Sequence, residues 1–202
     1  MFRKIVVVLA AVLLASIAIS ATQQKTPITK KVLNKKVSHP MVTIEMAKGT
    51  IKFEMFPESA PKTVARITEL IKKGFYNNLT FHRVVPGFVV QGGDPLGNGV
   101  GGTGVKIPAE FNSRKHVTGT VAMARSMDIN SGDCQFYICL ADQPGLDNNY
   151  TIFGQVVSGM DVVNKIRVGD VMKKVTVTET EQTKEVNSKK DTSKSKTEAP
   201  KK

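Results

Sequence analysis

Eight short, β-prone runs separated by turn residues constrain the fold more than any other feature of this chain. None is longer than eight residues, and they occupy 41–47, 50–56, 80–85, 88–91, 120–125, 134–140, 151–157 and 171–178. The first two alternate apolar and polar residues on either side of Lys48-Gly49, which is typical of a β-hairpin. So many short strands predict an all-β fold that buries its sheet edges by closing on itself.

Two helices are expected beside these strands. Ser59 is placed to cap a first helix that runs to about Lys73, with Pro61 tolerated in the first turn and Gly74 at the end. A second helix is expected over residues 159–167. Their inward-facing residues would be Val64, Ile67 and Ile71 in the first helix and Val162, Val163 and Ile166 in the second.

The two ends of the chain differ in composition from its middle. Residues 1–21 have a short basic start, an uncharged apolar stretch and small residues, which is the layout of a secretory signal peptide. The apolar stretch is short for a spanning helix of about 20 residues, so cleavage is favoured over a membrane anchor formed by residues 5–21. Residues 22–40 are predicted to be a flexible basic linker, and residues 179–202 a disordered charged tail.

The net charge of +12 lies mostly outside the predicted domain. Residues 22–40 carry five lysines and no acid, whereas residues 41–177 carry 15 basic and 12 acidic side chains. A basic face that binds nucleic acid is therefore not predicted. The lysine-rich flanks could make weak contact with a membrane or cell wall, but a solvated linker and tail are the simpler interpretation.

Neither a disulfide nor a cofactor site is predicted. Cys134 and Cys139 are five residues apart in an extended run, so they point to opposite faces and lie too far apart to bridge. Two free, buried thiols are expected. The three histidines, His39, His82 and His116, show no metal-ligand spacing. The glycine-rich run 97–102 fits a dinucleotide-binding pattern, but Pro108 follows it where a helix would be needed.

Arg83 and Gln91 are unusual because they stand in an otherwise apolar run, FHRVVPGFVVQGGD, from Phe81 to Asp94. In an extended strand Phe81, Arg83 and Val85 would share one face. The guanidinium would then lie at the edge of an apolar surface, where a charge needs a partner or a task. The alternative is a surface arginine whose stem covers apolar neighbours.

This run resembles the signature of the cyclophilin-type peptidyl-prolyl cis-trans isomerases. The resemblance continues, in family order, through Met123-Ala124, Gln135-Phe136-Tyr137, Leu146-Asp147 and Phe153-Gly154, and spans residues 41–177. It implies a mainly β domain over residues 41–178, a closed eight-stranded antiparallel β-barrel capped by two α-helices. We expect a monomer without cofactors or metals.

Rotation about an X-Pro amide needs no nucleophile, only relief of a barrier of about 18–20 kcal/mol. A fixed guanidinium near the twisted nitrogen would favour the transition state over both planar forms. By resemblance, Arg83 is the catalytic donor and Gln91 orients the arginine and the substrate. The substrate-binding positions that the resemblance implies are Phe88, Val89, Ala124, Arg125, Gln135, Tyr137, Leu146 and Tyr150. Phe88, Val89, Tyr137 and Leu146 could instead be ordinary core residues.

Several pocket positions depart from the family pattern. Tyr137 stands where the family often has Phe and adds a hydroxyl that must find a partner. Val89 replaces a common methionine, Arg125 an asparagine, and Tyr150 a histidine at the pocket rim. Gly145 stands where a tryptophan is associated with tight cyclosporin binding, so weak cyclosporin sensitivity is expected.

The leading hypothesis is an exported prolyl isomerase that acts on X-Pro segments of unfolded or folding polypeptides. A bacterial periplasm is the expected location, and a eukaryotic secretory compartment remains open. The alternative is a proline-peptide binding module or chaperone with little catalysis.

Overall fold

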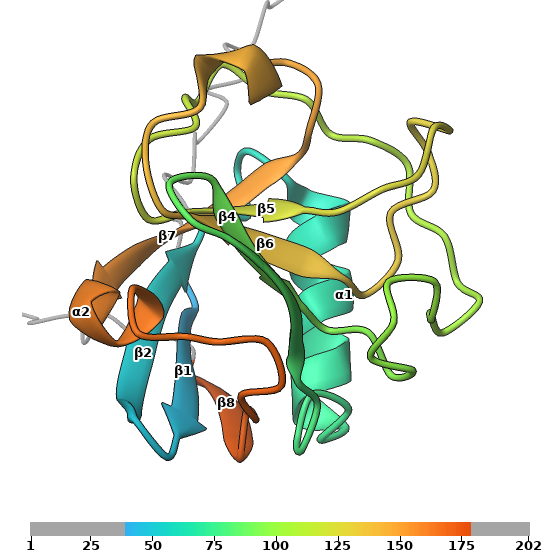
Figure 1. Ribbon diagram of the computed structural model, residues 1–202. Helices are drawn as coiled ribbons and strands as arrows, with labels where there is room; N and C mark the ends of the chain where they lie inside the picture. The colour runs from blue at the N-terminus through green and yellow to red at the C-terminus, as the bar shows by residue number, and fades with distance from the viewer. Residues whose placement is uncertain (1–38, 179–202) are drawn as a thin grey trace, which may run out of the picture. The chain divides into compact units, whose positions relative to one another are not determined.

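The computed structural model describes residues 39–178 (Figure 1). The predicted signal peptide, nearly all of the predicted linker and the predicted tail lie outside the described residues. Eight strands form one antiparallel sheet in the order β3-β4-β6-β5-β7-β2-β1-β8. The strands are β1 (Met41–Met46), β2 (Gly49–Met55), β3 (Phe81–Val85), β4 (Val89–Gly92), β5 (Thr120–Met123), β6 (Phe136–Cys139), β7 (Ile152–Ser158) and β8 (Lys174–Thr178).

The sheet is a curled, open half-barrel, so the predicted closed barrel is wrong. Its edge strands, β3 and β8, do not pair with each other. Instead, the loop that leads into β8 lies along the start of β3. The Phe81 N–H donates to the Asp170 carbonyl (2.9 Å), and the Gly169 N–H donates to the Phe81 carbonyl (3.0 Å). Thr80 and Val171 form an isolated bridge. The chain therefore meets β3 as a loop and becomes a strand only at Lys174, beside β1.

Helix α1 (Pro61–Lys72) buries the predicted stripe against the sheet. The predicted Ser59 cap is wrong, because the N-cap residue is Ala60 and it makes no side-chain cap. Glu110 takes this role from a distant part of the chain. Its carboxylate accepts hydrogen bonds from the backbone N–H groups of Lys62 (2.9 Å) and Thr63 (2.8 Å). A negative charge at this end also complements the helix dipole.

Helix α2 (Met160–Val163) is shorter than the predicted helix over 159–167. Gly159 precedes it with φ of 90°, a left-handed conformation that glycine adopts readily. The predicted inward residues Val162, Val163 and Ile166 are buried. In Figure 1, α1 lies to the right of the curled sheet and α2 to its left, and the buried residues of both helices belong to one core cluster. A short 3-10 helix, η1 (Pro144–Leu146), follows β6. Within residues 39–178, no helix is long and apolar enough to cross a bilayer.

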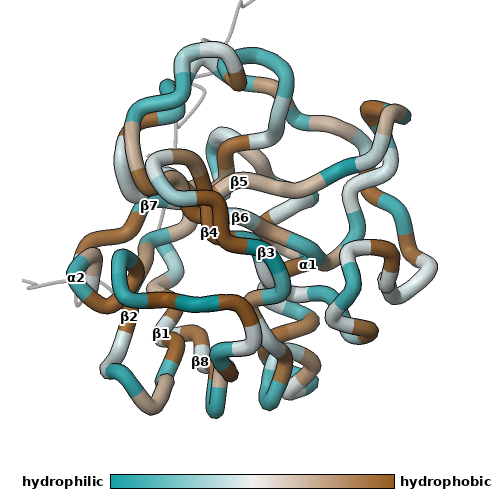
Figure 2. The backbone as a smooth tube through the Cα atoms, in the orientation of Figure 1, coloured by the Kyte–Doolittle hydropathy of each residue, from teal (hydrophilic) through white to brown (hydrophobic). Residues whose placement is uncertain are grey.

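The two faces of the sheet carry two separate apolar clusters. Along β6, Phe136 and Ile138 belong to the larger cluster, the core, whereas Tyr137 and Cys139 belong to the smaller one. Both cysteines are free and buried, as predicted, and Cys134 packs in the core cluster on the other side. The smaller cluster consists of Val89, Ala122, Tyr137, Cys139 and Ile152, with Phe88, Ala124, Leu146 and Tyr150 against it. Figure 2 shows hydrophobic residues, in brown, along much of β4, which lies next to the edge strand β3.

Candidate active site

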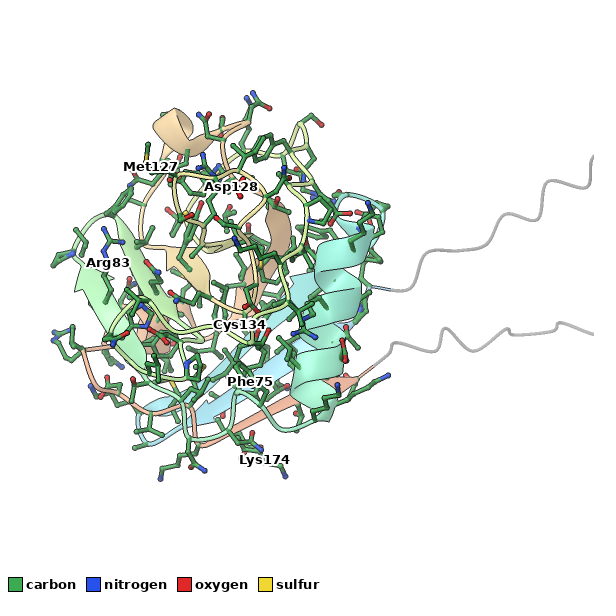
Figure 3. All side chains as sticks on the ribbon, turned by 90° about the vertical axis from the view of Figure 1, so that its right-hand side faces the viewer. Phe75, Arg83, Met127, Asp128, Cys134 and Lys174 are labelled. Atoms are coloured by element: carbon green, nitrogen blue, oxygen red, sulfur yellow. The ribbon has the colours of Figure 1, made fainter. Side chains whose placement is uncertain are left out.

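A β-bulge at His82 determines which way Arg83 faces. Phe81 pairs with Gly92, and Arg83 pairs with Gln91, so one extra residue stands between neighbouring pairs. The side chains of successive strand residues alternate between faces, and the bulge therefore places Phe81 in the core and Arg83 beside Gln91 on the opposite face. Val85 remains on the face of Arg83, but the predicted grouping with Phe81 is wrong. In Figure 3, Arg83 lies on the side of the sheet away from α1.

The extra residue itself is tightly enclosed. Neither ring nitrogen of His82 has a hydrogen-bond partner among residues 39–178, although both are buried. Burial lowers the pKa of His82 below its usual value, and the neighbouring Arg83 charge acts in the same direction, while Asp94 opposes it. His82 is therefore neutral at physiological pH and adds no charge beside the guanidinium.

A small cavity of about 150 Å³ opens on this face. Nine of the ten predicted site residues line it: Arg83, Phe88, Val89, Gln91, Ala124, Arg125, Tyr137, Leu146 and Tyr150. The cavity is smaller than the pockets of about 300–1,000 Å³ that enclose drug-sized ligands. Its size suits a single small apolar group, and the guanidinium of Arg83 lies at its edge.

Gln135, the tenth predicted residue, connects the cavity to the glycine-rich loop. Its Nε2 donates to the carbonyl of Gly101 (2.8 Å), which leaves Oε1 to accept from Gln91 Nε2 (2.9 Å). The Oε1 of Gln91 then faces Arg83 Nη1 at 3.4 Å. The carbonyl of Gly101 thus fixes the orientation of the Gln135 and Gln91 amides, so that an oxygen of Gln91 faces Arg83. The Arg83 guanidinium also lies 5.7 Å from the ring centre of Phe88.

A larger groove of about 620 Å³ continues from this chain of amides along the glycine-rich loop. Two carboxylates hold the loop. Asp94 accepts from the N–H groups of Leu96 (2.8 Å) and Asn98 (3.0 Å), and Asp133 accepts from Thr103 N–H (2.7 Å). Burial raises the pKa of Asp94, but these backbone donors outweigh it and hold that pKa below its usual value. The described chain between this loop and β5 contains no helix, which agrees with the prediction from Pro108.

Arg125 folds back onto the protein. Its guanidinium carbon lies 4.7 Å from the centre of the Tyr150 ring, and its Nε donates to the carbonyl of Asn149 (3.0 Å). Nη1 donates to the carbonyl of Ser126 (2.9 Å). Tyr150 in turn meets Tyr137 edge-on at 5.8 Å. Arg125 therefore closes one side of the cavity as a tethered cation over an aromatic ring.

Two residues at this site were missed as site residues from the sequence. His116 Nε2 lies 3.0 Å from the hydroxyl oxygen of Tyr137, and its Nδ1 lies 3.0 Å from Asp147 Oδ1. The sequence excluded His116 only as a metal ligand, because the three histidines show no metal-ligand spacing. The signal that could have found it is the Tyr137 hydroxyl, which needs a partner inside an apolar wall. Within residues 39–178, no group of three or more His, Cys, Asp or Glu residues could hold a metal ion.

Comparisons with known proteins agree with this geometry. The family model for "Cyclophilin type peptidyl-prolyl cis-trans isomerase/CLD" matches residues 41–188. A peptidyl-prolyl cis-trans isomerase of Synechococcus elongatus is 48% identical over 129 residues, which are 63% of this chain and 88% of that protein. Peptidyl-prolyl cis-trans isomerase B of Bacillus subtilis is 46% identical, over 63% of this chain and 90% of that protein.

A solved cyclophilin-type isomerase of Cryptosporidium parvum superposes with a TM-score of 0.65 at 28% identity, over 69% of this chain and 98% of that one. A second structure of that isomerase was solved in the presence of the dipeptide Ala-Pro. The chain belongs to the cyclophilin-type peptidyl-prolyl cis-trans isomerases. Its activity is the cis-trans isomerisation of peptidyl-prolyl bonds.

Proposed function

We propose that the 150 Å³ cavity accepts the proline ring of an X-Pro segment and that Arg83 donates a hydrogen bond to the prolyl nitrogen as the amide twists. Support comes from the Arg83 guanidinium at the rim of the cavity, oriented through Gln91, whereas the Arg125 guanidinium is tied to backbone carbonyls. The planar amide nitrogen accepts no hydrogen bond, whereas the pyramidal nitrogen of the twisted amide does. The donor therefore stabilises the transition state more than either ground state.

The residues around the cavity favour a non-covalent mechanism. Cys139 packs in the same apolar cluster, and burial raises the pKa of its thiol to about 12. Its thiolate, the nucleophilic form, is therefore scarce at neutral pH. Removing one preorganised hydrogen-bond donor typically costs about 10²–10³-fold in rate, and that is the contribution we assign to Arg83.

The test is the cis-to-trans rate of an Ala-Pro-Phe peptide with wild-type protein, Arg83→Ala and Arg83→Lys. We expect kcat/KM to fall about 10²–10³-fold in Arg83→Ala and to recover only partly in Arg83→Lys, which lacks the fork of donors. Arg167→Ala is the matched control, because Arg167 is also exposed and donates only to backbone carbonyls after α2. Full activity of Arg83→Ala would contradict the proposal.

Titration with the same peptide separates the isomerase from a binding module. Tight peptide binding by folded wild-type protein, with negligible acceleration of isomerisation, would support a proline-peptide binding module or chaperone instead. Circular dichroism of each variant shows whether a lost rate reflects lost folding.

We also propose that the protein is exported to a bacterial periplasm and serves polypeptides that fold there. The support is the signal-peptide layout of residues 1–21. Uncatalysed X-Pro isomerisation takes tens to hundreds of seconds and can limit folding. N-terminal sequencing of protein from the periplasmic fraction is expected to begin near Thr22. A chain that keeps Met1 and stays in the cytosolic fraction would contradict export.

A further inference from the structure

A hydrogen-bonded series of three side chains runs from the partly exposed Asp147 through His116 to Tyr137, and the latter two are buried. The side chain of His116 is fully buried, and its ring stacks on that of Tyr137 with centroids 6.1 Å apart and 16° between the planes. Tyr137 lines the cavity, whereas His116 and Asp147 do not. His116 therefore reaches the cavity through two rings that line it, Tyr137 by a hydrogen bond and Tyr150 by an edge-on contact with centroids 6.5 Å apart.

The ionisation states of Asp147 and Tyr137, the two ends of this series, determine which atoms carry the protons. The backbone and ring N–H groups of His116, followed by Lys115, lower the pKa of Asp147 to about 2. Asp147 is therefore ionised and can only accept, so His116 Nδ1 carries a proton and donates it. Burial lowers the pKa of His116 below its usual value, although Asp147 opposes this, so the ring is neutral near pH 7.

A neutral ring with its proton on Nδ1 has an acceptor at Nε2. Burial also raises the pKa of Tyr137, so the phenol keeps its proton and donates it to that nitrogen. The hydroxyl is thereby fully engaged with His116. The Tyr137 ring is held by this bond on one side and by Tyr150 edge-on at 5.8 Å.

Protonation of His116 reverses this arrangement. Nε2 becomes a donor, so the Tyr137 oxygen must accept and its own O–H loses its acceptor. The new charge is fully buried and faces few compensating groups. Asp147, with Lys115 3.0 Å from its other oxygen, lies on one side. Tyr137 and Tyr150, with Arg125 above the latter, lie on the other.

We propose that His116 is a positioning residue of the prolyl pocket, which holds Tyr137 in the orientation that accepts the proline ring, and that protonation of His116 weakens peptide binding. The proposal rests on the proposed function, because it takes the cavity as the proline pocket. It adds an acid sensitivity that acts on binding rather than on the donor Arg83.

The experiment measures kcat and KM for an Ala-Pro-Phe peptide with blocked ends between pH 5 and pH 8. We expect KM of the wild-type protein to rise severalfold on acidification, while kcat changes little and circular dichroism shows a folded protein. The chain has three histidines, so His39→Gln, His82→Gln and His116→Gln test each in turn. Only His116→Gln is expected to make KM independent of pH in this range.

Tyr137→Phe tests the route through the hydroxyl. Without the hydroxyl, protonation of His116 Nε2 has no bond through which to disturb the ring at position 137, so the rise in KM is expected to shrink or disappear. Histidine ring NMR gives an independent reading, because linkage requires that bound peptide lower the His116 pKa to match the change in affinity. This reading uses peptide binding alone, so it stands even if catalysis by Arg83 fails its own test.

Three results would overturn the proposal. The first is a pH-independent KM in folded, active wild-type protein. The second is an unchanged acid rise in His116→Gln, or its loss in His82→Gln or His39→Gln instead. The third is a Tyr137→Phe protein with the wild-type pH profile, which would show that His116 does not act through the hydroxyl.

Discussion

Phe81 and Arg83 are two residues apart on β3, yet their side chains lie on opposite faces of the sheet. Phe81 is fully buried in the core, and its ring would lie 3.0 Å from a Cβ at Gly92, whereas Arg83 is exposed and faces Gln91. The bulge at His82 produces this reversal. One short strand therefore carries a core residue and the proposed hydrogen-bond donor close together.

Substitutions at these two positions are expected to separate stability from rate. Phe81→Ala should lower the free energy of unfolding by about 3–5 kcal/mol, because it leaves a cavity in the core. Arg83→Ala should change it by no more than about 0.5 kcal/mol, since the side chain is exposed. Urea unfolding of both variants measures this difference. Equal losses of stability would mean that both side chains pack in the same environment.

Gln135→Leu is expected to slow catalysis without removing any group from the cavity. The substitution breaks the series from Gly101 to Arg83 and leaves Gln91 without the bond that orients it. The loss of a hydrogen bond worth about 1.4 kcal/mol corresponds to about a tenfold fall in kcat/KM. Gln155→Leu is the control. Gln155, on β7, also donates from its side-chain amide to a backbone carbonyl, that of Thr118 (2.9 Å). An equal effect of both variants would argue against a specific role for Gln135.

Gly159 and Gly169 form a matched pair for the cost of a side chain. Both have φ of 90°, but a Cβ at Gly159 would lie 2.3 Å from the Thr50 carbonyl oxygen, whereas Gly169 has open space. Gly169→Ala should cost about 1 kcal/mol of stability from backbone strain alone. Gly159→Ala should cost clearly more, because the backbone must also move. Thermal unfolding compares the two, and similar melting temperatures would show that the contact at Thr50 is easily relieved.

Stability is expected to fall in two steps on acidification. Burial lowers the pKa of His116 below the usual value of about 6.5, so its contribution is complete above that pH and decreases as the pH falls below it. The pKa of Asp147 is lowered to about 2, so its contribution is present above about pH 4 and is lost towards pH 2.

Urea midpoints between pH 7.5 and pH 2.5 measure these steps. His116→Gln should reduce the upper step, to which His82 also contributes, and Asp147→Asn should reduce the lower one, to which Asp94 also contributes, while keeping an oxygen for the His116 backbone N–H. A wild-type profile that is flat between pH 7.5 and pH 5 would contradict a neutral, buried His116.

Local patterns predicted the strands, and the resemblance to the cyclophilin family, carried by short motifs, predicted the residues around the cavity. The run from Phe81 to Asp94 supplies four of the nine residues that line the cavity, and its alternation predicts two strands. The bulge at His82 could not be read this way, since it depends on how β3 pairs with β4. A perfect alternation was the reasonable expectation, and it was wrong by one residue.

Contacts between distant segments account for the other differences. The cap of α1 comes from Glu110, 47 residues after Thr63, so no local pattern at Ser59 could show it. The bond between His116 and Tyr137 spans 21 residues, and neither residue signals the other in sequence. The predicted closure of the barrel was wrong for the same reason. Closure depends on whether residues 169–172 pair with β3 as a strand or pass it as a loop.

That loop also affects how the protein can meet its own substrates. Exposed strand edges recruit other extended chains through unpaired backbone groups, and unfolded polypeptides offer such groups in abundance. At the start of β3, the Phe81 N–H and C=O already bond to Asp170 and Gly169. An extended polypeptide cannot dock there as a ninth strand. At this point of the edge, the isomerase is therefore protected from strand-to-strand pairing with other chains.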